Sequence, residues 1–378
     1  MPGSVHAPAQ RVQRDMRTIV MSNVRSGYID QWRGVSVLAV VIYHASPDRL
    51  LLHTRTPTPI TDFLQLLIAR LGPLGVDTFF VISGFLITQL LLKEESRTGS
   101  VSLAAFYVRR ATRILPAMLV YVLTVMAASA AGVIRLEPME GVKAVSFLCN
   151  TSLVTCAWEF GQFWTLGVEE QFYLLWPLLL LLSGRFRVPL AAITMVVAAI
   201  CAMIPSLVVR EHFNNGLAVY CLSSGVLFAS SQKFRAAFAP IRRIPAWALL
   251  MPLLVVTPLY VDGHWHYGYP VALLTIAPIL VAVVLARDGN VFGPQLAESL
   301  RKVGLISYSL YIWHWLATWS FVSPMFRALS VLAIPLAWLC YRYIELPFIA
   351  AGRRWSQAII EGRHAADFSK EVGRGAEI

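Results

Sequence analysis

The sequence predicts an all-α membrane protein, a polytopic transmembrane helical bundle of about ten spans with both termini in the cytosol. Three observations lead to this fold class. Hydrophobic residues make up 57% of the chain, and charged residues make up only 14%, against about 25% in typical soluble proteins. Apolar runs of nearly bilayer-crossing length recur along the chain. Basic residues gather in alternate gaps between these runs.

The apolar runs give the expected spans. A helix needs about 20 mostly apolar residues to cross a bilayer, and several runs here are shorter or interrupted by proline. The expected spans are residues 30–52, 73–92, 112–132, 166–183, 188–209, 216–230, 246–261, 269–286, 303–322 and 328–348.

The basic clusters set the expected orientation. They precede the first span and follow each even-numbered one, and cytosolic loops of membrane proteins carry an excess of Lys and Arg. We therefore expect a cytosolic N-terminal leader at residues 1–27, a transmembrane domain at 28–350 and a cytosolic C-terminal tail at 351–378. The excess of Lys and Arg in the cytosolic loops then accounts for the net charge of +11, so no nucleic-acid partner is expected.

The cysteines show no spacing typical of metal ligands, so no metal is expected. Cys149 and Cys156 share an expected external loop, where a disulfide and two unrelated thiols are both open interpretations. Cys201, Cys221 and Cys340 lie in apolar runs and are interpreted as packing residues.

The first expected span carries a polar stripe. Arg33 and His44 are eleven residues apart, almost three helical turns, so they face the same side about 16 Å apart along the axis. Asp30 lies one turn before Arg33 and could pair with it. The alternative is that Asp30 and Arg33 anchor the helix at the membrane interface and His44 is a hydrogen-bonded core residue. We favour function for His44, because histidine accepts protons near neutral pH.

Two later spans carry acidic groups. Asp77 lies near the external end of the second span, where Ser83 and Gly84 are small residues that favour close helix packing. Glu169 and Glu170 lie at the start of an apolar run, and ionisable groups at membrane depth are functional candidates. Nothing around Ser83 resembles a nucleophile elbow, so packing is its expected role.

The basic turn RRATRILP follows the second span, and its three arginines, Arg109, Arg110 and Arg113, can share a helix face. Guanidinium groups bind phosphate oxygens, so these arginines could bind a cytosolic ligand with several phosphates. Equally, they could serve only to keep this end of the span in the cytosol. Near the C-terminus, His314 lies in an aromatic-rich span and could be functional or structural. Glu345 could pair with a residue such as Arg342 or project inward.

Six motifs in order resemble the acyltransferase-3 family of integral membrane O-acyltransferases. Each motif is weak alone, but their order along nearly the whole chain is specific. They are IDQWRGVSVLAVVIYHA (29–45), GVDTFFVISGF (75–85), FYVRRATRILP (106–116), FWTLGVEEQFYLLWP (163–177), ISYSLYIWH (306–314) and ELP (345–347).

The resemblance implies a bacterial cytoplasmic (inner) membrane enzyme that transfers an acyl group, usually acetyl from acetyl-CoA, to a hydroxyl. The implied acceptors are a saccharide, polysaccharide or lipid-linked glycan, or a small product such as a macrolide. The family's Arg-and-His pattern falls on Arg33 and His44, and its R-x-x-R pattern falls on Arg110 and Arg113. Its glutamate falls on Glu169 or Glu170.

From these residues we expect His44 to act as general base, with Glu169 or Glu170 orienting its ring. Arg33 would stabilise the oxyanion or hold the donor. The alternative class is a proton-coupled transporter, which also uses His and Glu in broken helices. Transporters usually show an internal repeat, and none is evident in this sequence.

Overall fold

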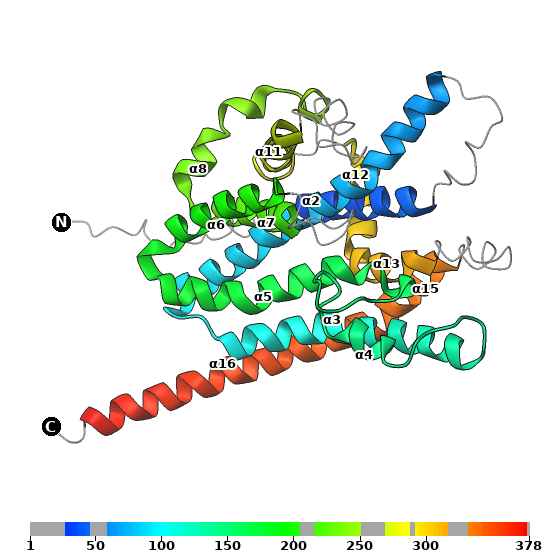
Figure 1. The fold of residues 1–378 in the computed structure, drawn as a ribbon. Coiled ribbons are helices and arrows are strands. Elements are labelled where there is room, and N and C mark those ends of the chain that lie inside the picture. The colour runs from blue at the N-terminus through cyan, green and yellow to red at the C-terminus, as the bar shows by residue number, and fades with distance from the viewer. Residues whose placement is uncertain are drawn as a thin grey trace.

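The computed structural model of the chain describes residues 27–45, 59–204, 215–250, 269–287, 292–316 and 332–375 (Figure 1). Within these ranges all regular secondary structure is helical, which confirms the all-α class. Nearly all of the expected leader and most of the expected span at 246–261 lie outside the described residues.

The first described helix covers residues 27–45. The elements that follow are α2 (Pro59–Thr98), α3 (Leu103–Ala130), α4 (Glu140–Val145), η1 (Trp158–Phe160), α5 (Phe163–Ser183), η2 (Gly184–Phe186), α6 (Arg187–Ala202), α7 (Asn215–Ser230), α8 (Gln232–Ala237), η4 (Pro240–Arg243), α11 (Tyr269–Leu280), η5 (Val281–Leu285), α12 (Pro294–Leu305), α13 (Ser307–Trp313), α15 (Ala333–Cys340), η7 (Tyr341–Glu345) and α16 (Leu346–Gly375).

Within the described residues, three helical stretches are long and apolar enough to cross a membrane: Leu71–Thr98, Leu103–Ala130 and Phe163–Ala202. The third contains two expected spans, α5 and α6, which turn back on each other at η2 (Figure 1). Asn215–Ser230 and Leu274–Leu285 are shorter apolar helices. The chain is thus a helical membrane protein, while the number of spans and the side on which each end lies stay predictions.

Close helix crossings hold the bundle together. Gly84 of α2 lies against the backbone of Leu222 in α7, and Gly225 of α7 lies against the backbone of Val81 in α2. Any side chain at these glycines would push the two helices apart, because a Cβ atom would overlap the opposite main chain. The expected packing role of Gly84 is therefore confirmed.

The C-terminal helix lies alongside α3 (Figure 1). Gly352 of α16 packs on the side chain of Thr112, and Ser356 is buried one turn further on. The helix runs without interruption through the boundary expected at residue 350. The first turns of the expected tail therefore belong to the packed structure.

The loop between α4 and α5 is closed by a disulfide between Cys149 and Cys156, which decides between the two interpretations of these residues. Asn215 of α7 donates a hydrogen bond to the carbonyl of Asn150 at 2.7 Å. Tyr121 of α3 donates one to the carbonyl of Glu159 at 2.9 Å. The loop is thus tied to both α7 and α3.

We expect Gly84→Ala to lower stability by about 1–3 kcal/mol, because the added methyl group overpacks the crossing of α2 and α7. The midpoint of thermal unfolding in detergent, followed by size-exclusion fluorescence, measures the effect. Gly362→Ala is the matched control, since an added Cβ there meets no atom within 4 Å. Equal midpoints for the two variants would contradict the role of the crossing.

Candidate active site

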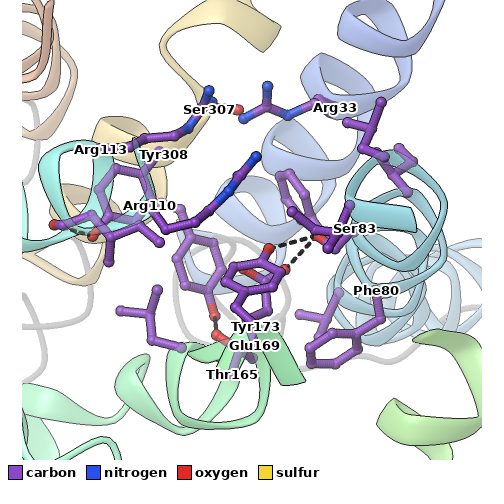
Figure 2. A pocket seen from close by; sticks show the side chains of 18 residues that line it. Arg33, Phe80, Ser83, Arg110, Arg113, Thr165, Glu169, Tyr173, Ser307 and Tyr308 are labelled. Carbon is purple, nitrogen blue, oxygen red and sulfur yellow. Dashed lines mark hydrogen bonds between the residues drawn. The ribbon is translucent and has the colours of Figure 1, made fainter. Parts of the chain in front are cut away.

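A cavity of about 140 Å³ opens between the first helix, α2, α3, α5 and α13 (Figure 2). Its wall combines cationic, acidic, hydroxyl-bearing and apolar side chains. The polar ones are Arg33, Ser83, Arg110, Arg113, Thr165, Glu169, Tyr173, Ser307, Tyr308 and Tyr311.

Three arginines from two helices form what we call the arginine cluster: Arg33, Arg110 and Arg113 (Figure 2). Arg33 keeps the expected ion pair with Asp30, at 3.6 Å. The Arg110 guanidinium lies 5.6 Å from the ring centroid of Tyr173, and its Nε atom is buried without a hydrogen-bond partner. Cations gathered at one cavity wall suit an anionic ligand, because guanidinium groups bind phosphates in bidentate fashion.

The acidic group of the cavity is Glu169. Ser83 donates a hydrogen bond to its Oε1 at 2.7 Å, and Tyr173 donates one to the Ser83 hydroxyl at 3.2 Å (Figure 2). Glu170 is not among the cavity-lining residues, although its Oε1 is buried without a partner. Of the two glutamates, Glu169 is the one that lines the cavity, and which of them is functional stays a prediction.

Ser83 illustrates what the sequence interpretation missed. Packing was its expected role, and its neighbour Gly84 does pack against α7. One residue turns a helix by about 100°, so Ser83 points to another side, toward Glu169 of α5. The sequence interpretation also did not identify Tyr173, Tyr311 and Thr165 as cavity residues. Aromatic and small side chains in an apolar span are usually interpreted as packing residues.

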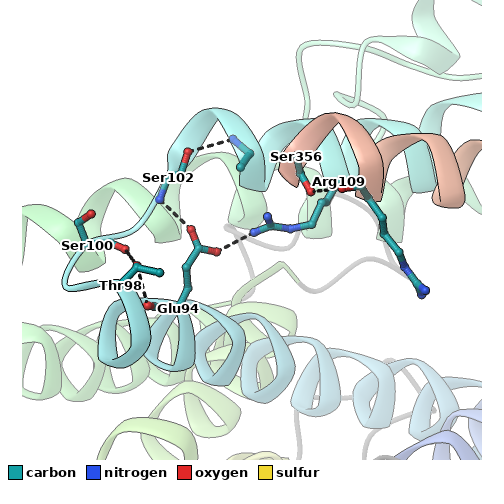
Figure 3. Close-up of polar contacts among 8 residues, drawn as sticks. Glu94, Thr98, Ser100, Ser102, Arg109 and Ser356 are labelled. Carbon is teal, nitrogen blue, oxygen red and sulfur yellow. Dashed lines mark hydrogen bonds and ion pairs between the residues drawn. The ribbon is translucent and has the colours of Figure 1, made fainter. Parts of the chain in front are cut away.

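Arg109 does not join the cluster, contrary to the expectation that all three arginines share one face. Its Nη2 lies 2.8 Å from Glu94 Oε2, while Glu94 Oε1 accepts a hydrogen bond from the backbone N–H of Ser102 at 2.8 Å (Figure 3). Arg109 and Arg110 are adjacent and so point in directions about 100° apart. Arg109 therefore fastens the end of α2 to the start of α3.

Glu345 projects inward, the second of its two expected arrangements. It is 1% exposed, lies at the end of the π-helical segment η7, and accepts a hydrogen bond from Ser309 at 2.8 Å. Its electrostatic partners include Arg113 and Arg33. Arg342, its other suggested partner, lies over the ring of Tyr343.

A second polar group, which we call the histidine pair, consists of His44 and His314. Their ring centroids are 5.0 Å apart, and the His44 ring lies 4.8 Å from that of Trp315. Neither histidine is among the cavity-lining residues. His44 Nδ1 lies 3.0 Å from the carbonyl oxygen of Val40, one turn earlier.

Tyr311 and Thr165 both line the cavity, and their hydroxyl oxygens are 2.6 Å apart. The Tyr311 ring centroid is 5.1 Å from that of His314. Glu169 accepts its hydrogen bond from Ser83, which is bonded in turn to Tyr173, so the expected orienting role of Glu169 toward His44 stays a prediction.

Asp77 lies apart from this arrangement. It is buried in α2 near Cys221 of α7 and does not line the cavity. Among the described residues, no three His, Cys, Asp or Glu side chains form a group suited to a metal ion.

The comparisons with known proteins agree on one family, the acyltransferases. The profile of a family described as "Acyltransferase domain" matches residues 26–342. "Putative O-acetyltransferase SACOL0978" of Staphylococcus aureus (strain COL) is 28% identical over 366 residues, covering 86% of this chain and 57% of the relative. "O-acetyltransferase OatA" of S. aureus (strain NCTC 8325 / PS 47) is 26% identical over 320 residues, covering 76% and 49%.

The chain thus spans about half the length of the curated relatives it matches. No solved structure matches it.

We expect Arg109→Ala to lower stability by about 1–2 kcal/mol, because it leaves the partly buried Glu94 carboxylate without its ion pair. The thermal midpoint of the purified protein measures this loss. Arg301→Ala is the control, since it breaks a pair with Glu298 of similar length whose partners are 37% and 47% exposed. A control that loses as much as the variant would contradict the fastening role of Arg109.

Proposed function

Because the chain belongs to the acyltransferase family whose profile spans residues 26–342, we propose that it is a membrane O-acyltransferase. It moves an acyl group, acetyl in most of the family, from acyl-CoA to a hydroxyl of a saccharide or glycan acceptor. The observation that carries this proposal is the arginine-lined cavity, whose lining residue Tyr311 packs against His314 of the histidine pair.

In this proposal the arginine cluster holds the donor. Coenzyme A carries several phosphates, and Arg110 and Arg113 are the cavity residues that match the basic motif. Arg33 lies with them and keeps one anionic partner, Asp30. Of the two roles expected for Arg33, its position in the cluster favours holding the donor over stabilising the oxyanion.

His44 is the proposed general base. As the acceptor hydroxyl attacks the thioester carbonyl, the imidazole takes its proton, the C–S bond breaks, and the proton passes to the leaving thiolate. Glu169 instead serves the donor side, where it accepts a hydrogen bond from Ser83, whose hydroxyl in turn accepts one from Tyr173. The acyl group must then pass Tyr311 to reach the acceptor.

The proposed setting is the bacterial inner membrane, with about ten spans and both termini in the cytosol. The arginine end then faces the cytosol, where acyl-CoA is available. The histidine end faces outward, and the disulfide between Cys149 and Cys156 near that end supports this orientation, because disulfides persist in oxidising compartments. A small alcohol such as a macrolide is the second acceptor class.

We expect His44→Ala to reduce acyl transfer at least about a hundredfold, because a positioned general base contributes roughly 10²–10⁴ in rate. Thiol release from acetyl-CoA by the protein in lipid nanodiscs, with a panel of N-acetylglucosamine oligomers as acceptors, measures the rate. His364→Ala, in the second half of α16, is the control and should keep the wild-type rate. Near-normal turnover by the His44 variant at normal expression would reject the assignment.

We expect Arg110→Ala and Arg113→Ala each to weaken acetyl-CoA binding about tenfold or more, since a hydrogen bond to a charged group contributes about 1.5–3 kcal/mol. Isothermal titration with acetyl-CoA gives the dissociation constants. Arg109→Ala is the matched control, being an adjacent arginine whose partner is Glu94. A donor affinity that falls equally in all three variants, or in none, would remove the cluster from the donor site.

A further inference from the structure

Ser307 carries a buried hydroxyl group at the wall of the cavity. The residue is 0% exposed and lines the cavity, and its Oγ atom has no hydrogen-bond partner among the residues that the structure describes. Figure 2 shows it at the side of the cavity where Arg33 and Arg113 lie. An unsatisfied buried polar atom is uncommon in proteins and calls for an explanation.

The position of Ser307 in the chain explains why it lacks the usual partner. A serine inside a helix commonly donates to a carbonyl three or four residues earlier, as Ser224 does to Cys221 at 2.7 Å. Ser307 is instead the first residue of α13, directly after the break at Ile306 where α12 ends. Because no turn of its own helix precedes it, its hydroxyl is left to bond with a group outside α13.

The start of α13 is anchored first through Gly304, three residues before Ser307. Gly304 lies against the backbone of Asp30 in the first helix, where a Cβ atom would overlap the opposite main chain. Asp30 is one turn before Arg33 on that helix. The glycine contact therefore brings the start of α13 next to the part of the first helix that carries Arg33.

The second anchor is Tyr308, the residue after Ser307. Its hydroxyl donates a hydrogen bond to the carbonyl of Ile114 in α3 at 2.7 Å. Ile114 directly follows Arg113, so this bond brings the start of α13 next to the basic turn of α3. Ser307 thus lies where the first helix and α3 approach each other, which explains why it shares one cavity with an arginine from each.

The neighbouring carboxylates do not bond to this hydroxyl. Asp30 pairs with Arg33 at 3.6 Å. Glu345 accepts a hydrogen bond from Ser309 at 2.8 Å, and its second oxygen, Oε1, has no partner among the described residues. The acceptor for Ser307 is then left to a ligand that enters the cavity.

The chemistry of the three side chains selects an anion with several oxygens. A guanidinium group only donates hydrogen bonds, and a serine hydroxyl can donate as well. Arg33 and Arg113 are electrostatic neighbours, and their like charges repel each other. A phosphate group accepts hydrogen bonds from both guanidinium groups, which offsets the repulsion, and it has a further oxygen for the hydroxyl.

We propose that Ser307 is a donor-binding residue, whose hydroxyl donates a hydrogen bond to a phosphate oxygen held by Arg33 and Arg113. These three side chains form one phosphate subsite, whereas the Arg110 guanidinium lies near the ring of Tyr173. The proposal rests on the proposed function, in which the cavity holds a phosphorylated acyl donor. It adds a residue of α13 to the arginines of the basic motif and the first helix.

The test measures the binding of inorganic pyrophosphate to the full chain in phosphatidylcholine nanodiscs by isothermal titration. We expect Ser307→Ala to weaken binding about tenfold, the loss typical of a hydrogen bond to a charged group. Ser307→Cys keeps the shape with a weaker donor and should lose several-fold. Ser224→Ala is the matched control, being a buried serine already bonded to a carbonyl, and should keep the wild-type affinity.

Nanodiscs that contain phosphatidylglycerol distinguish a soluble phosphate from a lipid headgroup. The ratio between the affinities of the wild type and of Ser307→Ala should be the same in both kinds of nanodisc. A ratio that disappears when the anionic lipid is present assigns the subsite to the headgroup and overturns the proposal.

Two further results would overturn it: a wild-type chain that binds no pyrophosphate, and serine variants that bind it as tightly as the wild type. The first of these needs no variant to fold. Pyrophosphate carries no acyl group, so the result is separate from the proposed function. A chain that transfers no acyl group can still use Ser307 to bind the anion, and an active chain can bind its donor without this hydroxyl.

Discussion

Polar and charged side chains inside an apolar helical bundle must be paired or must line a polar cavity, because an unpaired charge at membrane depth costs several kcal/mol. The described part of this chain follows that rule. Asp30 pairs with Arg33, Glu169 with Ser83, and Glu345 with Ser309. Among the described residues, buried side-chain atoms without a hydrogen-bond partner occur at the cavity, as in Arg110 and Ser307, and also away from it, as in Arg287.

The helix crossings determine which polar side chains meet at the cavity. Glycines bring the main chains of α2 and α7 together, and Gly34 of the first helix lies equally close to the backbone of α12. These contacts fix the rotation of α2 and of the first helix about their own axes. Ser83 and Arg33 are thereby aimed at the same cavity, whose lining residue Tyr311 packs against His314.

The arginine cluster and the histidine pair differ in chemistry, and the proposed transfer reaction would use both. Cations at one end suit a phosphate-rich donor, and imidazoles at the other suit the activation of a hydroxyl. Tyr311 lines the cavity, shares a hydrogen bond with Thr165 and packs against His314. The fold therefore brings the cavity and the histidine pair to opposite contacts of one residue, Tyr311.

The sequence by itself determined the all-helical membrane class, the family, and the residue types at the site, because hydropathy, motif order and ionisable groups in apolar runs are local properties. It also predicted the ion pair of Asp30 with Arg33, since three-residue spacing brings side chains together on any helix. Only the tertiary structure decided that Glu169 lines the cavity while Glu170 does not. It also decided that Arg109 forms an ion pair with Glu94 and that Ser83 donates a hydrogen bond to Glu169. Each of these choices depends on which way a helix is rotated, and packing against distant segments sets that rotation.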